Sequence, residues 1–233
     1  MLRKSTNSSR RSAVITGVLL IAGMVAGIFS VVPVIDGADY MVKAFANENQ
    51  VLIGALFQLL MVVAYVGIPI LIYPILSKHN KGLALGSVAF GIIAGVFIII
   101  GVIVLLLLLT LSHEFAKAGA QDASYFHTLG GLLQAGRDLV NHVATTLSFV
   151  IAMLLYNCIF YQTKLVPRWL SVWGIVGSIW SILASLLFMI RLIGVDETYM
   201  VLNIPIAFQQ LALAIWLIVR GFNRAVQDSV SDK

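Results

Sequence analysis

The sequence predicts an all-α fold, a polytopic membrane helical bundle with six transmembrane helices and with both termini in the cytoplasm. Of the 233 residues, 60% are hydrophobic and only 11% are charged, whereas a soluble domain carries about 25% charged residues. A soluble fold of this length could not hide so much apolar surface from water. Six apolar runs are long enough to cross about 30 Å of hydrocarbon as helices, and most cations lie on one side of those runs.

The six runs form one predicted transmembrane domain, 13–219, between a basic N-terminal segment, 1–12, and a tail, 220–233. The helices are expected at about residues 13–35, 51–76, 83–111, 139–161, 169–192 and 202–219. The third run is long, so we expect it to tilt or to extend beyond the bilayer. The first run exceeds the about 7–15 apolar residues of a signal peptide, so we expect an uncleaved helix. Barrel strands are not expected, because their period-two alternation is missing.

The positions of Lys and Arg predict the orientation. One side holds Arg3, Lys4, Arg10, Arg11, Lys78, Lys81, Lys164, Arg168, Arg220, Arg224 and Lys233. Cytoplasmic segments are enriched in such residues, so we expect a multi-pass protein of the plasma membrane with cytoplasmic N- and C-termini. A nucleic-acid-binding protein would gather its cations in one patch, so the net charge of +5 indicates topology and no nucleic-acid partner. The longest outer connection is 112–138, and we expect function on this face because loops often carry it.

The fourth predicted helix carries a polar cluster at its outer end, and this cluster is the main candidate site. Its members are Arg137, Asp138, Asn141 and His142. Ionisable groups at membrane depth usually face the bundle interior or water. One interpretation is a ligand or proton site, with Asp138 as acceptor or base, His142 as its proton-exchanging partner and Arg137 as an anion contact. The other is a structural Arg–Asp pair, with His142 hydrogen-bonded to a neighbouring helix.

Other polar residues give weaker signals. Gln209 and Gln210 in the sixth helix are candidates for a pocket lining or for hydrogen bonds between helices. The four histidines match no metal or haem spacing, so neither a metal nor another cofactor is expected. Cys158 has no second cysteine to pair with. The sequence contains no nucleotide-binding, serine-nucleophile or HExxH motif, so no residue is assigned a catalytic role.

Small residues repeat at helix spacing in three of the runs, and in the fifth run they are Gly177, Ser181 and Ser185. Gly23 and Gly27 form one GxxxG motif, and Gly91 and Gly95 form another. Such stripes let helices approach closely. They predict a tight bundle or, alternatively, a seam between copies in a homo-oligomer.

Several stretches of the sequence also match a known pattern. They are 73–76 (Tyr-Pro-Ile-Leu) with 83–86 (Leu-Ala-Leu-Gly), Gly136-Arg137-Asp138 with His142, 155–174, 204–207 and 214–219. On these stretches the chain resembles the bacterial membrane family catalogued as domain-of-unknown-function family 4386. In that family pattern an Arg and a Glu often lie near Gly91 and Ala94, and a Glu near Gln210. The resemblance implies a membrane bundle and supplies no established activity.

Three functions are compatible with these observations. The first is a non-enzymatic membrane protein that binds a small ligand, a lipid or a partner at the outer-facing polar site. The second is a small transporter or permease, which needs a water-accessible path through the bilayer. The third is an intramembrane enzyme acting on lipid, in which His113, His127, Asp138 and His142 would have to converge.

Overall fold

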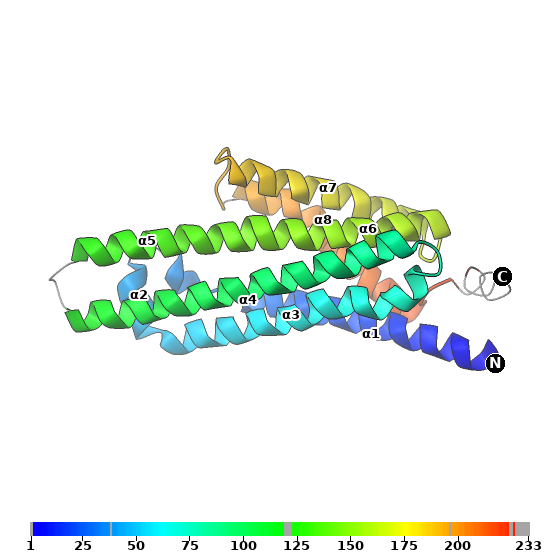
Figure 1. Cartoon of the computed structure of the whole chain (residues 1–233), viewed down its shortest axis with the longest axis horizontal. Helices are drawn as coiled ribbons and strands as arrows, with labels where there is room; N and C mark the ends of the chain where they lie inside the picture. Colours follow the sequence, from blue (N-terminus) through cyan, green and yellow to red (C-terminus); the bar gives the residue numbers. More distant parts are fainter. Residues whose placement is uncertain (1, 38, 119–122, 196, 224–225, 227–233) are drawn as a thin grey trace.

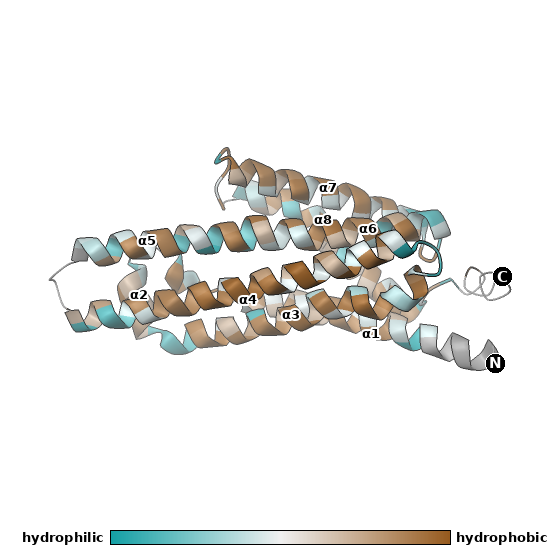
Figure 2. Ribbon diagram, in the orientation of Figure 1, coloured by the Kyte–Doolittle hydropathy of each residue, from teal (hydrophilic) through white to brown (hydrophobic). Residues whose placement is uncertain are grey.

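The computed structural model of the chain describes residues 2–37, 39–118, 123–195, 197–223 and 226, without the side chains of 2–8 and 123. The elements are α1 (Leu2–Phe29), η1 (Pro33–Ile35), α2 (Tyr40–Ala46), α3 (Glu48–Leu76), α4 (Lys81–Ala118), α5 (Ala123–Leu139), η2 (Val140–Thr145), α6 (Thr146–Thr163), α7 (Arg168–Met189) and α8 (Glu197–Val219). Within these described ranges, six helices are long and apolar enough to cross a membrane, and Figure 2 shows hydrophobic residues along them. The all-α bundle with six apolar spans is therefore confirmed, and the chain is a multi-pass membrane protein.

The bundle has two ends of different character (Figure 1). At the basic end lie the start of α1, the end of α8, the α3–α4 turn with Lys78 and the α6–α7 turn with Lys164. At the opposite, extended end, α4 and α5 reach past α7 and α8 and run beside α2. The α4 helix has 38 residues, or about 57 Å, whereas α7 has 22, or about 33 Å. Since hydrocarbon is about 30 Å thick, α7 matches a bilayer and α4 exceeds it.

Two separate hydrophobic cores follow from this shape. The larger one joins α1, α3, α4, α6, α7 and α8, and it contains fully buried side chains such as Met153, Leu170 and Leu213. The second core lies at the extended end, where Ile35, Met41, Leu105 and Leu108 of η1, α2 and α4 are fully buried. Phe115, Phe126 and Leu133 of α4 and α5 pack against this second core. Apolar burial thus holds the extension together as a small folded layer.

The extension corrects the prediction of a long outer loop over 112–138. Most of this segment is helical, because α4 continues to Ala118 and α5 begins at Ala123. The predicted fourth helix is likewise the second half of a longer rod, Ser124–Thr163. The sequence analysis missed these helices because they are shorter and more polar than a membrane span, and because their apolar faces pack on distant segments.

Two predicted helix ends are also corrected. The first helix ends at Phe29 rather than at 35, and the chain turns into η1 at Pro33. Proline lacks a backbone N–H and disfavours helical geometry in the residue before it. The fifth helix ends at Met189 rather than at 192, because Arg191 adopts a left-handed backbone with φ 60°. Such a residue ends an α-helix.

The predicted glycine stripes lie inside the bundle. A Cβ on Gly91 would lie 2.6 Å from Pro69 Cγ and 2.9 Å from the Tyr65 carbonyl oxygen, so only glycine lets α4 approach α3 this closely. A Cβ on Gly23 would lie 2.9 Å from Ala64 Cβ, again on α3. Both stripes therefore form contacts between helices of one chain.

A single arginine ties the first helix to the last one at the basic end. Arg10 Nη1 donates to Leu217 O (3.1 Å), and Arg10 Nη2 donates to Ile218 O (2.7 Å). The last carbonyls of a helix lack partners and carry partial negative charge. Arg10 thus caps α8 from another element, and the helix ends within the next residues.

Candidate functional site

The polar cluster predicted on the fourth helix lies at a change in helical geometry. Val140–Thr145 form the π-helical segment η2 between α5 and α6, and this segment contains Asn141 and His142. Short π segments are rare and occur often at functional sites, because the extra residue per turn shifts the side chains around the helix. The segment lies at the level where α7 ends and α8 begins.

Arg137, just before the π segment, faces the extended end. Its Nη1 lies 3.3 Å from Asp36 Oδ1, and its side chain is only 10% exposed, against 57% for Asp36. One turn earlier, Gln134 Nε2 donates to the Ile35 carbonyl. Two side chains of α5 therefore hold the segment around η1. The Arg137 Nε atom is buried and has no hydrogen-bond partner within the described part of the chain.

Asp138, unlike the adjacent Arg137, has no ion-pair partner among the described residues. It is half-buried, and no hydrogen bond or ion pair joins it to another described residue. The charges that act on it belong to Arg137 and Asp36. The expected pairing with His142 is not formed, although both residues are described. Because Arg137 is already paired with Asp36, the three groups together leave one uncompensated negative charge at this position.

His142 faces α7 and α8. The centroid of its ring lies 5.0 Å from that of Tyr199 and 5.9 Å from that of Phe188, and both contacts are edge-to-face. The backbone carbonyl of His142 accepts a hydrogen bond from the Tyr199 hydroxyl (3.1 Å). The histidine is therefore one of three aromatic rings that pack against one another between η2, α7 and α8.

A polar network that sequence analysis missed continues from this point into the bundle. The Tyr199 hydroxyl lies 3.3 Å from Thr146 Oγ1, which in turn donates to Asn141 O (3.0 Å). On α8, Asn203 Nδ2 donates to Tyr199 O (2.9 Å), and Asn203 Oδ1 accepts from Ser181 Oγ of α7. In the sequence, the only sign of this network was the four-residue spacing of Tyr199 and Asn203, which places both on one face of a helix. Ser181 was interpreted only as a packing residue.

Asn141 faces α4 instead. A Cβ on Gly101 would lie 2.5 Å from Asn141 Oδ1, so the amide occupies the space that the glycine leaves. Further along the same face, Thr145 and Ser148 are buried. Arg137, Asn141, Thr145 and Ser148 thus lie on a face that points into the protein.

Gln209 and Gln210 do not join the cluster. Gln209 Nε2 donates to Leu170 O (3.3 Å), and Gln210 Nε2 lies 3.2 Å from Met153 Sδ. Gln209 follows Tyr199 by ten residues of α8, or about 15 Å along the axis. The structure therefore brings four of the six predicted site residues together near η2 and places these two deeper, toward the basic end.

The other histidines are scattered. His113 Nε2 lies 3.4 Å from Glu48 Oε2 on α3, and the His127 ring contacts Phe115 at the extended end. His79 lies in the turn at the basic end, where burial and the charge of Lys78 lower its pKa below 6.5. Among the described residues, no group of three His, Cys, Asp or Glu residues could hold a metal ion.

Comparison with known proteins assigns the chain to a family. The family model for a domain of unknown function, DUF4386, matches residues 15–221. No match was found among curated proteins or among solved structures. The match spans every apolar helix, from within α1 to the end of α8. The chain therefore belongs to the DUF4386 family of domains of unknown function.

Proposed function

We propose that this membrane protein is a non-enzymatic binding protein whose ligand places a positively charged amine against Asp138. The ligand is a small cation or the amine headgroup of a lipid. The observation that carries the proposal is the charge arrangement at the site: Arg137 is paired with Asp36, whereas Asp138 is half-buried without an ion pair among the described residues. A partly buried carboxylate gains most from a cationic hydrogen-bond donor.

The proposal places the extended end on the outer side of the membrane. Support comes from Lys78, Lys81, Lys164 and Arg168, which all lie at the basic end in or beside the two short turns, since such residues are enriched in cytoplasmic segments. Asp138 then lies near the outer membrane surface, about 30 Å from those cations. This is the depth at which lipid headgroups meet water.

The surroundings of Asp138 suit an ammonium group. His142, Tyr199 and Phe188 form a cluster of aromatic rings one turn further into the membrane. Cations are attracted to aromatic rings, and desolvation strengthens the attraction.

The arrangement supports binding over the two alternatives. Beneath the site, the Tyr65 ring stacks on Phe149 with centroids 3.7 Å apart, and Met153 is fully buried. Packed side chains thus occupy the place where transport needs a water-accessible path. Catalysis would require His113 and His127 near Asp138, but those residues contact Glu48 and Phe115 instead.

The test compares Asp138→Asn with Asp39→Asn. Asp39 is an exposed carboxylate of the extended end whose ion partner is Lys43 at 3.6 Å. Each variant is reconstituted in nanodiscs of phosphatidylglycerol and titrated with ethanolamine and with choline. In a second arm, nanodiscs that contain phosphatidylethanolamine are used, and retained lipid is counted by native mass spectrometry. The two arms distinguish a free amine from a lipid headgroup.

We expect Asp138→Asn to weaken binding about tenfold or more, since a charged hydrogen bond contributes about 1.5–3 kcal/mol. Asp39→Asn should bind like the unaltered protein, and both variants should melt at the same temperature. The proposal fails if the unaltered protein binds none of these amines. It also fails if the two substitutions change binding equally.

A further inference from the structure

Arg168, the first residue of α7, lies over an aromatic ring at the basic end. Its guanidinium carbon, Cζ, is 5.3 Å from the centroid of the Tyr161 ring. Tyr161 belongs to the last turn of α6, so the contact joins two helices across their short turn (Figure 1). A guanidinium that packs on a ring keeps N–H donors at its edge for other partners. Because Arg168 and Tyr161 are both exposed, those donors are accessible from the surface of the bundle.

The charge of Arg168 has no counter-ion within the described part of the chain. The ion pairs among the described residues involve other cations, and all of them lie away from the basic end. The exposed cations of the basic end are Arg11, Lys78, Lys81, Lys164, Arg168 and Arg220. The described carboxylates all lie at the extended end or at the level of η2, and they are Asp36, Asp39, Glu48, Glu114, Asp138 and Glu197. Arg168 is therefore available to an anion from outside the chain.

The depth of Arg168 in the membrane indicates which anion it meets. The α7 helix begins at Arg168 and has 22 residues, or about 33 Å, so its first residue lies where the about 30 Å of hydrocarbon ends. Trp169 and Trp173 follow on the same helix, with ring centroids 6.3 Å apart. Trp and Tyr side chains are enriched at this level of a bilayer. Phosphate groups of lipids lie directly outside the hydrocarbon, so they meet Arg168 at its own depth.

An apolar stripe continues from Arg168 into the membrane. Trp169, Val172, Val176 and Ile179 are all exposed, and their spacing of three, four and three residues places them on one face of α7. Ile179 follows Arg168 by eleven residues, or about 16 Å along the axis, which is the depth of one leaflet. Acyl chains can lie along this face below a phosphate that contacts Arg168. The surface thus offers a donor for a headgroup and an apolar face for its chains.

We propose that Arg168, positioned by Tyr161, binds the phosphate of an anionic phospholipid in the leaflet at the basic end. Arginine donates two parallel hydrogen bonds to phosphate oxygens. A lipid with net negative charge is favoured over a zwitterionic one, because Lys164 in the same turn adds positive charge and no described carboxylate opposes it. The site lies at the opposite end of α7 from Asp138, so it does not rest on the amine site proposed above.

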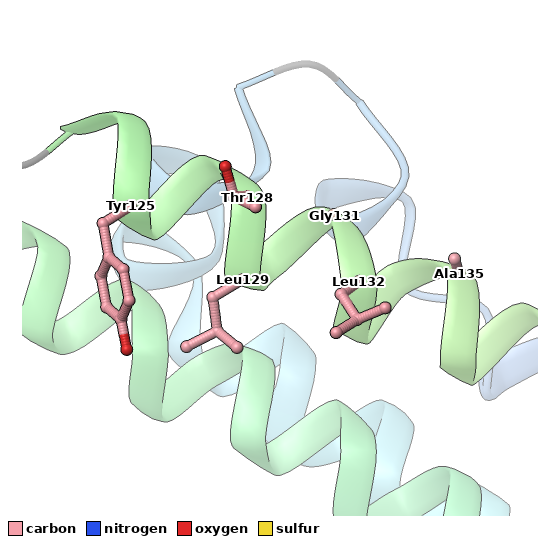
Figure 3. Close-up of a pocket in the computed structure, with 6 residues that line it drawn as sticks. All are labelled: Tyr125, Thr128, Leu129, Gly131, Leu132 and Ala135. Carbon is pink, nitrogen blue, oxygen red and sulfur yellow. The ribbon is translucent and has the colours of Figure 1, made fainter.

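The pocket on α5 lacks the chemistry for this ligand. Figure 3 shows Tyr125, Leu129 and Leu132 beside one another on this helix. The pocket is lined by Tyr125, Thr128, Leu129, Gly131, Leu132 and Ala135. None of these six residues is a cation, and the pocket belongs to the extended end. An anionic headgroup therefore has no charged donor there, whereas Arg168 provides one.

The first experiment counts bound lipid by native mass spectrometry. The full chain in detergent is titrated with phosphatidylglycerol and with phosphatidylcholine of the same acyl chains. We expect Arg168→Gln to weaken phosphatidylglycerol binding about tenfold, since charged hydrogen bonds are lost. Tyr161→Leu keeps the charge but not its position, so it should weaken binding less than Arg168→Gln does. Arg220→Gln is the matched control, an exposed arginine of the same end, and it should bind like the unaltered chain.

The second experiment uses tryptophan fluorescence in phosphatidylcholine vesicles. Brominated lipids quench tryptophans that they contact, and Trp169 lies directly beside Arg168. We expect brominated phosphatidylglycerol to quench the unaltered chain more than brominated phosphatidylcholine does, and Arg168→Gln to abolish this excess without a change in melting temperature. Soluble glycerol phosphate should not reduce the excess, whereas a site for free phosphate would be emptied of lipid. Equal quenching by the two lipids, displacement by glycerol phosphate, or equal effects of Arg168→Gln and Arg220→Gln would each overturn the proposal.

Discussion

Arg137 and Asp36 lie 101 positions apart in the chain, yet Arg137 Nη1 lies 3.3 Å from Asp36 Oδ1. This contact fastens α5 to the segment that follows α1, and it decides the charge of the candidate site. The arginine side chain is 10% exposed and the aspartate is 57% exposed, so the pair bridges a buried position and a solvated one. A buried guanidinium without its partner is more costly than an exposed carboxylate without one.

We therefore expect Asp36→Asn to destabilise the protein through Arg137. The loss should be about 1–2 kcal/mol, because solvent at Asp36 screens part of the interaction. Thermal unfolding in detergent, followed by tryptophan fluorescence, measures the effect. The double variant Asp36→Asn with Arg137→Gln should be less destabilised than the sum of its single changes. Additive single effects would show that the two side chains act independently.

Arg10 should stabilise α8 although it belongs to α1. Arg10→Ala removes the donors to Leu217 O and Ile218 O and should lower the free energy of unfolding by about 1–2 kcal/mol, as the loss of a helix cap does. Arg11→Ala is the matched control, since the exposed Arg11 carries the same charge next to it. Hydrogen exchange should accelerate in the last turn of α8 only in Arg10→Ala. Equal exchange in both variants would contradict the capping role.

Two glycines should respond to alanine in opposite directions. Gly91→Ala places a methyl group 2.6 Å from Pro69 Cγ and 2.9 Å from the Tyr65 carbonyl, and overpacking of this kind costs about 1–3 kcal/mol. Gly136→Ala meets no atom within 4 Å, and alanine in a helix is favoured over glycine by about 0.5–1 kcal/mol. Melting temperatures of the two variants measure the difference. A lower value for Gly136→Ala than for Gly91→Ala would contradict this account of α3–α4 packing.

The proposed orientation can be tested with a thiol reagent that does not cross membranes. In a Cys158→Ser background, Lys117→Cys at the extended end should react in intact cells, whereas Lys78→Cys at the basic end should react only after lysis. Lys117 is 71% exposed, so accessibility does not limit its reaction. Labelling of Lys78→Cys from outside would reverse the topology and place Asp138 on the cytoplasmic side.

The sequence alone was sufficient to predict the six transmembrane helices, because the lipid bilayer imposes a simple local rule on the chain. Each crossing helix needs about 20 apolar residues, and backbone groups in lipid must be paired within the helix. The positions of Gly91 and Gly95 were likewise informative about close packing. The cluster from Arg137 to His142 stood out because charged groups at membrane depth are rare.

Only the tertiary structure shows which partners the side chains of that cluster contact. The partner of Arg137 comes from η1, and the ring contacts of His142 come from α7 and α8, so no spacing along one helix could predict them. Adjacent helical residues such as Asn141 and His142 point about 100° apart, and only the packing of the bundle shows that they face α4 and α7–α8 respectively. The helices of the extension form because Phe115, Phe126 and Leu133 pack on a second core built from remote segments. Local composition determines which segments enter lipid. Contacts between segments determine which charged side chains lack an ion pair and which helix faces remain exposed.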